Sequence, residues 1–163
     1  MLDNETLALA QKVNDRLILA GHTMATAESC TGGLIAAAIT SVSGSSAVLY
    51  GGFVTYSNAA KTEMIDVPAT LIESYGAVSE PVARAMAEGA VRRTDVDLAI
   101  AVTGIAGPGG GSEEKPIGLV HFGLAHSGQF VHREKQYGDL GRDGIRQATV
   151  RAALEMVLEV YAP

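Results

Sequence analysis

The sequence predicts an α/β fold, a single-domain three-layer α/β/α sandwich around a mixed sheet. Segments with apolar residues three and four apart, typical of helices, alternate with strand-length apolar runs. Residues 97–103 form a continuous apolar run, which is typical of a strand buried on both faces. Residues 127–129 (Ser-Gly-Gln) separate two strand patterns and indicate an antiparallel hairpin. A mixed sheet covered by helices on both faces satisfies all three observations.

The boundaries of the elements follow from caps and helix-ending residues. Gly21 and Gly76 each end a helical pattern, and Asn58 and Ser79 are each placed to cap one. Pro68 is suited to the first turn of a short helix. The expected helices cover residues 4–20, 34–39, 59–65, 68–75, 80–93 and 142–161. The expected strands cover residues 23–27, 47–57, 97–103, 119–126 and 130–137.

Three glycine-rich segments lie outside this regular pattern. Two glycines interrupt the strand at 47–57 and indicate a bulge or a close approach of the backbone. A polar loop covers residues 41–46, and a Gly/Pro-rich loop covers 104–118. Neither an internal repeat nor a linker divides the 163 residues, so residues 1–163 are expected to form one domain.

Composition excludes several classes of protein. Twelve Lys and Arg against 18 Asp and Glu give a net charge of −6, which disfavours nucleic-acid binding because such binding depends on neutralising phosphates. No apolar run reaches the roughly 18 residues of a membrane span. One cysteine cannot form an intrachain disulfide and suits the reducing cytoplasm. We expect a cytoplasmic protein without membrane contact, and a homodimer as the default assembly.

The turn at residues 29–33 (Ser-Cys-Thr-Gly-Gly) is the first candidate site. It lies where a predicted strand enters a helix, and helix N-termini offer unpaired N–H groups that hold anions or an oxyanion. The candidate donors are the amides of Cys30, Thr31, Gly32 and Gly33. Ser29 is equally compatible with a simple capping role. The turn matches neither a Walker loop nor the Gly-x-Ser-x-Gly motif of hydrolases.

A serine nucleophile requires a base. The four histidines are expected at the surface or at strand edges, and they show neither triad placement nor zinc-binding spacing. Lysine is the alternative base, as in Ser–Lys hydrolases. Lys61 lies one turn into the helix that Asn58 is expected to cap, shortly after Tyr56. Taken alone, this pattern favours an ordinary solvated lysine.

Two further segments contain groups that are suited to bind a phosphate. The loop at 103–118 follows the most apolar strand, and loops at the ends of such strands commonly line ligand sites. Its glycines allow a ligand to approach the backbone, and Lys115 supplies a charge. Arg142 and Arg146 are four residues apart on one helix face, where they form either a phosphate clamp or a pair of solvated arginines.

Four motifs, taken together, resemble the CinA C-terminal domain family: AESCTGG at 27–33, GGFVTYSNAAK at 51–61, GAVSE at 76–80 and TGIAGPGGGSEEKPIG at 103–118. The resemblance covers nearly the whole chain. Stand-alone members of this family include nicotinamide-nucleotide amidohydrolase. The resemblance therefore implies hydrolysis of the carboxamide of nicotinamide mononucleotide to nicotinate mononucleotide and ammonia, without a metal or another cofactor, in pyridine-nucleotide recycling.

The resemblance also implies roles for individual residues. Ser29 would be the nucleophile, Lys61 the base and Tyr56 its helper, with the amides of Cys30 and Thr31 as the oxyanion hole. The 103–118 loop, which contains Thr103, Gly104, Gly107 and Lys115, would help to hold the nucleotide together with Arg146. The sequence positions argued above add Gly32, Gly33 and Arg142 as candidate substrate-binding residues.

Three alternatives remain open at this point. Cys30 is a rival nucleophile because a thiol is intrinsically stronger, and its alternative role is that of a small buried packing residue; the resemblance favours Ser29. The protein as a whole is also compatible with a nucleotide-binding or regulatory module without turnover. The third alternative is an amidase that acts on another small amide.

Overall fold

One five-stranded mixed sheet organises the protein, and the computed structural model describes residues 2–162. The strands are β1 (Met24–Glu28), β2 (Leu49–Val54), β3 (Leu98–Gly104), β4 (Leu119–His126) and β5 (Gln129–Gln136). Their order in the sheet is β2-β1-β3-β4-β5. Strand β1 pairs in parallel with β2 and β3, whereas β4 is antiparallel to both β3 and β5. The predicted mixed sheet is confirmed.

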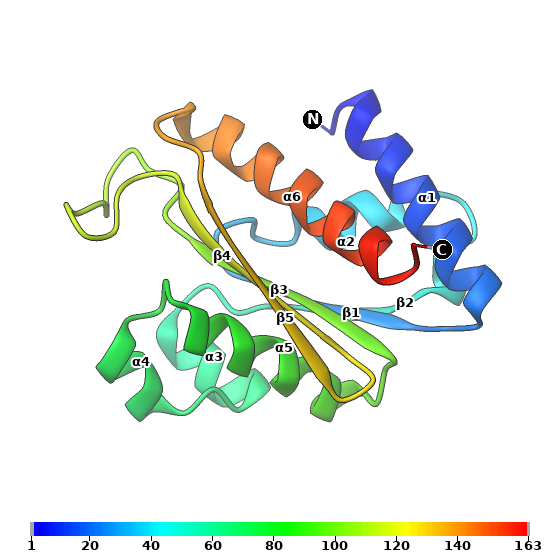
Figure 1. Cartoon of the computed structure of the whole chain (residues 1–163), viewed down its shortest axis with the longest axis horizontal. Coiled ribbons are helices and arrows are strands. Elements are labelled where there is room, and N and C mark those ends of the chain that lie inside the picture. The colour runs from blue at the N-terminus through cyan, green and yellow to red at the C-terminus, as the bar shows by residue number, and fades with distance from the viewer. Residues whose placement is uncertain (1, 163) are drawn as a thin grey trace.

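Helices cover both faces of this sheet. They are α1 (Asn4–Ala20), α2 (Leu34–Thr40), α3 (Asn58–Ile65), α4 (Ala69–Tyr75), α5 (Glu80–Thr94) and α6 (Gly141–Val160), with a 3-10 turn at Ser45–Ala47. Helices α1, α2 and α6 lie on one face, and α3, α4 and α5 lie on the other (Figure 1). The predicted three-layer sandwich is therefore confirmed.

Strand β3 packs into two separate apolar clusters, one on each face of the sheet. Ile100 and Val102 belong to the cluster beneath α1, α2 and α6, whereas Ala99 and Ala101 belong to the cluster beneath α5. Successive side chains of a strand point to opposite faces, so a strand covered on both faces needs apolar residues throughout. This explains the continuous apolar run in the sequence.

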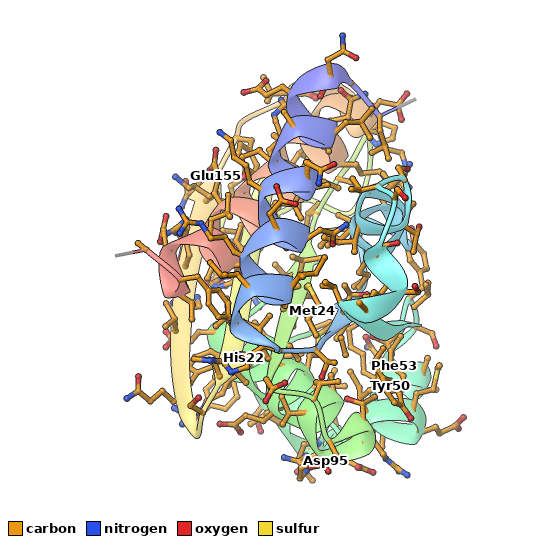
Figure 2. The ribbon with its side chains drawn as sticks, turned by 90° about the vertical axis from the view of Figure 1, so that its right-hand side faces the viewer. His22, Met24, Tyr50, Phe53, Asp95 and Glu155 are labelled. Atoms are coloured by element: carbon orange, nitrogen blue, oxygen red, sulfur yellow. The ribbon has the colours of Figure 1, made fainter. Side chains whose placement is uncertain are left out.

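The glycines of β2 permit the close approach that the sequence indicates. A Cβ atom on Gly52 would lie 2.5 Å from the hydroxyl oxygen of Thr26 and 3.4 Å from the Cβ of Ala36. The pairing of β1 with β2 also has a register irregularity between Met24 and Ala25. Strand β2 forms one edge of the sheet, where Tyr50 and Phe53 are labelled in Figure 2. Both the irregularity and the close approach are thus present.

Several predicted boundaries are wrong by a few residues. Ser57, not Asn58, caps α3, because its hydroxyl accepts a hydrogen bond from the amide of Ala60. The hairpin turn consists only of Ser127 and Gly128, which both have positive φ, as a type I′ turn requires. The strand expected at 47–57 is shorter, because a 3-10 turn precedes it and residues 55–57 leave the sheet.

The chain crosses the sheet on opposite faces before and after β2. The connection from β1 to β2 passes through α2, whereas the connection from β2 to β3 passes through α3, α4 and α5 on the other face (Figure 1). This reversal opens a crevice at the carboxyl end of β1, the usual ligand position in α/β sheets. In the described part of the chain, no helix is long and apolar enough to cross a membrane.

Candidate active site

The carboxyl ends of the three parallel strands meet around Ser29. Ser29 follows β1 directly, and its amide donates to the carbonyl of Val102 on β3 (3.1 Å). On the other side, the amide of Thr55, just after β2, donates to the carbonyl of Glu28 (2.9 Å). The main chain of the nucleophile candidate is therefore fixed between its two neighbouring strands.

Lys61 is buried beside Ser29 and is not a solvated residue. Only 1% of it is exposed, and its amine Nζ lies 3.0 Å from the hydroxyl oxygen Oγ of Ser29. The same amine contacts the carbonyl oxygens of Thr55 (2.8 Å) and Tyr56 (3.4 Å). The expectation of a solvated lysine, which rested on the pattern alone, is wrong. Lys61 belongs to the first turn of helix α3, and its side chain points toward the crevice at the carboxyl end of β1.

Burial changes the acidity of this lysine. The removal of water lowers the pKa of Lys61 from its usual value to about 8, because a charged amine is poorly solvated there. At this pKa a substantial fraction of the amine is neutral near physiological pH. Its two carbonyl contacts can use N–H groups of the neutral amine, which leaves the lone pair to accept the Ser29 proton. The arrangement fits a general base.

A small pocket opens onto this pair. Its volume is about 190 Å³. It is lined by Ser29, Cys30, Tyr56, Asn58, Lys61, Ala77, Val78, Thr103, Gly104, Ala106 and Arg142. The start of the 103–118 loop reaches this pocket, whereas its glycine-rich middle projects away from the sheet (Figure 1). Asn58, Ala77, Val78 and Ala106 were not singled out from the sequence as ligand-contacting residues.

Within residues 2–162, three amides of the turn at residues 29–33, those of Cys30, Thr31 and Gly33, have no hydrogen-bond partner in another residue. The amide of Gly32 donates to the carbonyl of Ser29 (3.1 Å), which closes the turn. The amides of Cys30 and Thr31 belong to the residues directly after Ser29, where an oxyanion hole requires its donors.

Cys30 has the properties of a packing residue. It is 5% exposed, and it belongs to the apolar cluster beneath α1, α2 and α6. Burial, aided by the nearby charge of Glu28, raises the pKa of its thiol to about 12. A thiol with this pKa is almost entirely protonated at neutral pH, and only the thiolate is nucleophilic.

The two arginines of α6 have different surroundings. Arg142 lines the pocket, where its guanidinium donates to the hydroxyl of Tyr56 (2.9 Å) and the carbonyl of Gly107 (2.8 Å). Arg146 instead donates to the carbonyls of Cys30 (3.2 Å) and Thr31 (2.9 Å). Arg146 thus supports the turn rather than lining the pocket, so the two do not form a common clamp.

The other residues predicted to act in the site lie at varying distances from the Ser29–Lys61 pair. Thr103 lines the pocket and donates to the carbonyl of Ala77 (2.8 Å), so it joins β3 to the pocket wall. Gly33 has φ 100° and directly precedes α2, where left-handed backbone favours glycine. Lys115 lies outside the pocket lining, and its amine donates to the carbonyl of Tyr75. The Tyr56 hydroxyl contacts Arg142 rather than Ser29 or Lys61.

The four histidines form two pairs away from Ser29. His121 and His132 are joined through Nδ1 and Nε2 at 2.9 Å, between β4 and β5. His22 lies near Met24 at the start of β1 (Figure 2), where its ring is 5.9 Å from that of His126. All four are partly buried. His132 lies on the edge strand β5, His126 at the end of β4 and His22 just before β1, which agrees with the expected surface or strand-edge positions. None of the four lines the pocket at Ser29.

The fold and this geometry define a class: an α/β protein with a buried Ser–Lys pair beneath a glycine-assisted turn. The profile of the CinA C-terminal domain matches residues 6–161. The chain belongs to this family.

Relatives in sequence and in structure agree with this assignment. A CinA-like protein of Parasynechococcus marenigrum is 51% identical over 149 residues, which cover 91% of this chain and 36% of that protein. The chain thus spans about a third of the length of that relative. The solved competence/damage inducible protein CihA of Agrobacterium tumefaciens is 48% identical, with a TM-score of 0.97 and 99% of both chains covered. The competence damage-inducible protein A of Klebsiella pneumoniae is 35% identical, with a TM-score of 0.92 and 96% of both chains covered.

Proposed function

We propose that this protein is an amidohydrolase that converts nicotinamide mononucleotide to nicotinate mononucleotide and ammonia. The observation that carries the proposal is the contact between the buried Lys61 amine and the Ser29 hydroxyl, 3.0 Å apart. A buried lysine of lowered pKa that contacts a serine at a pocket is the arrangement that activates serine in Ser–Lys hydrolases. The nucleotide itself rests on the resemblance of the four sequence motifs to the amidohydrolases of the family.

The reaction proceeds in two stages. In the first, neutral Lys61 accepts the hydroxyl proton as the Ser29 oxygen attacks the carboxamide carbon. The negative oxygen that develops on this carbon is held by the free amides of Cys30 and Thr31. The protonated Lys61 then gives its proton to the departing nitrogen, and ammonia leaves. An ester between Ser29 and the nicotinoyl group remains.

In the second stage, water replaces ammonia. Lys61 is neutral again and accepts a proton from a water molecule, which attacks the ester carbon. The same two amides hold the second oxyanion, and the ester bond breaks. Lys61 returns the proton to the Ser29 oxygen, and the acid is released. This sequence uses one base throughout and consumes one water for each amide.

The size of the pocket supports a proposal for where each part of the nucleotide binds. Its volume of about 190 Å³ is below the ~300 Å³ typical of sites that enclose a whole ligand. We therefore place the pyridine ring and its carboxamide in the pocket, and the ribose and phosphate at its mouth. Arg142 is the cation that lines this pocket besides Lys61, so it is the phosphate partner that we propose.

A comparison of three substrates tests the proposal. Purified protein should release ammonia from nicotinamide mononucleotide faster than from nicotinamide riboside, and faster again from the riboside than from nicotinamide. Equal rates on all three would favour an amidase of small amides, because the phosphate would then contribute nothing. Tight binding of pyridine nucleotides without any ammonia release would overturn the enzymatic function in favour of a binding module.

A further inference from the structure

The carboxylate of Glu28 is fully buried directly before Ser29 and accepts four hydrogen bonds. Two come from hydroxyl groups, those of Thr31 (2.7 Å) and Thr26 (3.2 Å). The other two come from the amides of Ile35 (2.8 Å) and Ala36 (3.1 Å) in the first turn of α2. Glu28 is 0% exposed. Its carboxylate therefore joins the last residue of β1 to the turn and to the helix that follows it.

We propose that Glu28 is a positioning residue that holds the amide of Thr31 in place as an oxyanion donor. The inference rests on the proposed hydrolysis at Ser29. Glu28 acts through the Thr31 hydroxyl and touches neither the substrate nor the reacting atoms.

Burial of the Glu28 carboxylate costs free energy unless hydrogen bonds replace those that it would make with water. A buried carboxylate without hydrogen bonds is strongly unfavourable, and the four donors together with the positive end of α2 offset that penalty. The carboxylate also occupies the amides of Ile35 and Ala36, which would otherwise be open to a ligand anion. Within residues 2–162, the amides of Cys30, Thr31 and Gly33 remain without a partner in another residue, and the first two lie next to Ser29.

Thr31 is held from a second direction by Arg146. The guanidinium donates to the carbonyl of Cys30, which belongs to the same planar peptide group as the Thr31 amide. In a trans peptide the carbonyl and the amide hydrogen point in opposite directions, so a carbonyl fixed by Arg146 also fixes the direction of that N–H. Glu28 fixes the side chain of Thr31, and Arg146 fixes the peptide before it.

Two threonines allow a matched test, because each donates one hydroxyl hydrogen bond to the same carboxylate. Thr31→Val removes the bond within the turn, whereas Thr26→Val removes the bond within β1 and serves as the control. Glu28→Gln keeps the size of the side chain and removes its charge. For each variant we would measure kcat and KM for ammonia release and the thermal unfolding midpoint. The rate at which an alkyl fluorophosphonate labels Ser29 would be measured beside them. In that labelling the serine oxygen displaces fluoride from phosphorus, and its proton passes to Lys61.

The positioning role of Glu28 predicts that the variants differ in kcat, labelling rate and unfolding midpoint. Thr31→Val and Glu28→Gln should lose about 10- to 100-fold in kcat and in labelling rate, less than the 10²–10³ expected when a donor is removed outright. Their KM should stay near the wild-type value. Thr26→Val should lower the unfolding midpoint and keep the wild-type kcat. A purely structural role predicts instead that all three lose activity only in proportion to lost stability.

The outcomes separate this inference from the proposed function. If Ser29 is labelled but no pyridine nucleotide releases ammonia, the substrate proposal fails and the labelling rates still test Glu28. If folded Thr31→Val and Glu28→Gln keep wild-type labelling and kcat, the positioning role is overturned. Wild-type protein that shows neither labelling nor ammonia release would overturn both.

Discussion

The amine of Lys61 and the hydroxyl of Ser29 lie 3.0 Å apart, although 32 residues separate them in the chain. The contact arises because β1 and β2 are parallel neighbours, so the segments that follow them meet at one edge of the sheet. Helix α3 then directs Lys61 back toward Ser29.

The pH dependence of activity should report the acidity of Lys61. Its pKa is lowered to about 8 by burial, and the neutral amine is the active form. We expect kcat/KM for nicotinamide mononucleotide to rise with pH and to level off above about 8. A pH–rate profile of the wild-type protein measures this. Activity that falls as the pH rises through 8 would mean that the protonated amine is the form required.

The same lysine should make stability depend on pH. Between pH about 8, the pKa of Lys61 in the folded chain, and its usual pKa of 10.5, the unfolded chain holds a proton on Lys61 that the folded chain has released. The free energy of unfolding should therefore rise with pH across this window. The effect is isolated by subtracting the pH profile of Lys61→Met from that of the wild type, both measured by urea unfolding. A flat difference would show that burial does not shift this pKa.

Cys30 should contribute far less to catalysis than its neighbour. Because burial raises the pKa of the thiol to about 12, little thiolate forms at pH 8, and alkylation of the folded protein should be slow. Cys30→Ala should lose less than about tenfold in kcat, since it removes packing but keeps the amide. Ammonia-release kinetics and the rate of iodoacetamide labelling test both statements. Loss of activity in Cys30→Ala alone, with Ser29→Ala active, would make cysteine the nucleophile.

Arg142 should act on binding of the phosphate. A charge-assisted hydrogen bond contributes about 1.5–3 kcal/mol, so Arg142→Ala should raise KM for nicotinamide mononucleotide by about 10- to 150-fold. The KM for nicotinamide riboside, which lacks the phosphate, should change little. Steady-state kinetics on both substrates give the comparison. An equal rise in both KM values would assign Arg142 to the support of Tyr56 and Gly107 instead.

The sequence predicts the layers of the fold more completely than it predicts the side-chain contacts of the site. Apolar periodicity and glycine stops predict the layers, because they report burial directly. The contacts of Glu28 escape such an analysis, since two of its partners are backbone amides seven and eight residues further along the chain. Burial of Lys61 was missed for a related reason. One lysine in a short helix does not reveal which face of that helix will be covered.

Some predicted roles depend on neighbours that no local pattern specifies. Arg142 and Arg146 share a helix face in the sequence, but the peptide groups that reach Arg146 come from the turn after β1. Lys115 is equally suited to a phosphate by its charge, yet it contacts the carbonyl of Tyr75. The homodimer, like the nucleotide substrate, stays a prediction.

Replacement of Ser29 tests the central claim most directly. Wild-type protein and Ser29→Ala would be compared for ammonia release from nicotinamide mononucleotide at pH 8, with thermal unfolding to show that both are folded. We expect the wild type to turn over and Ser29→Ala to lose activity by at least about 10³-fold, as for other serine nucleophiles. Wild-type rates in folded Ser29→Ala would contradict the assignment of Ser29 and Lys61 as the catalytic pair.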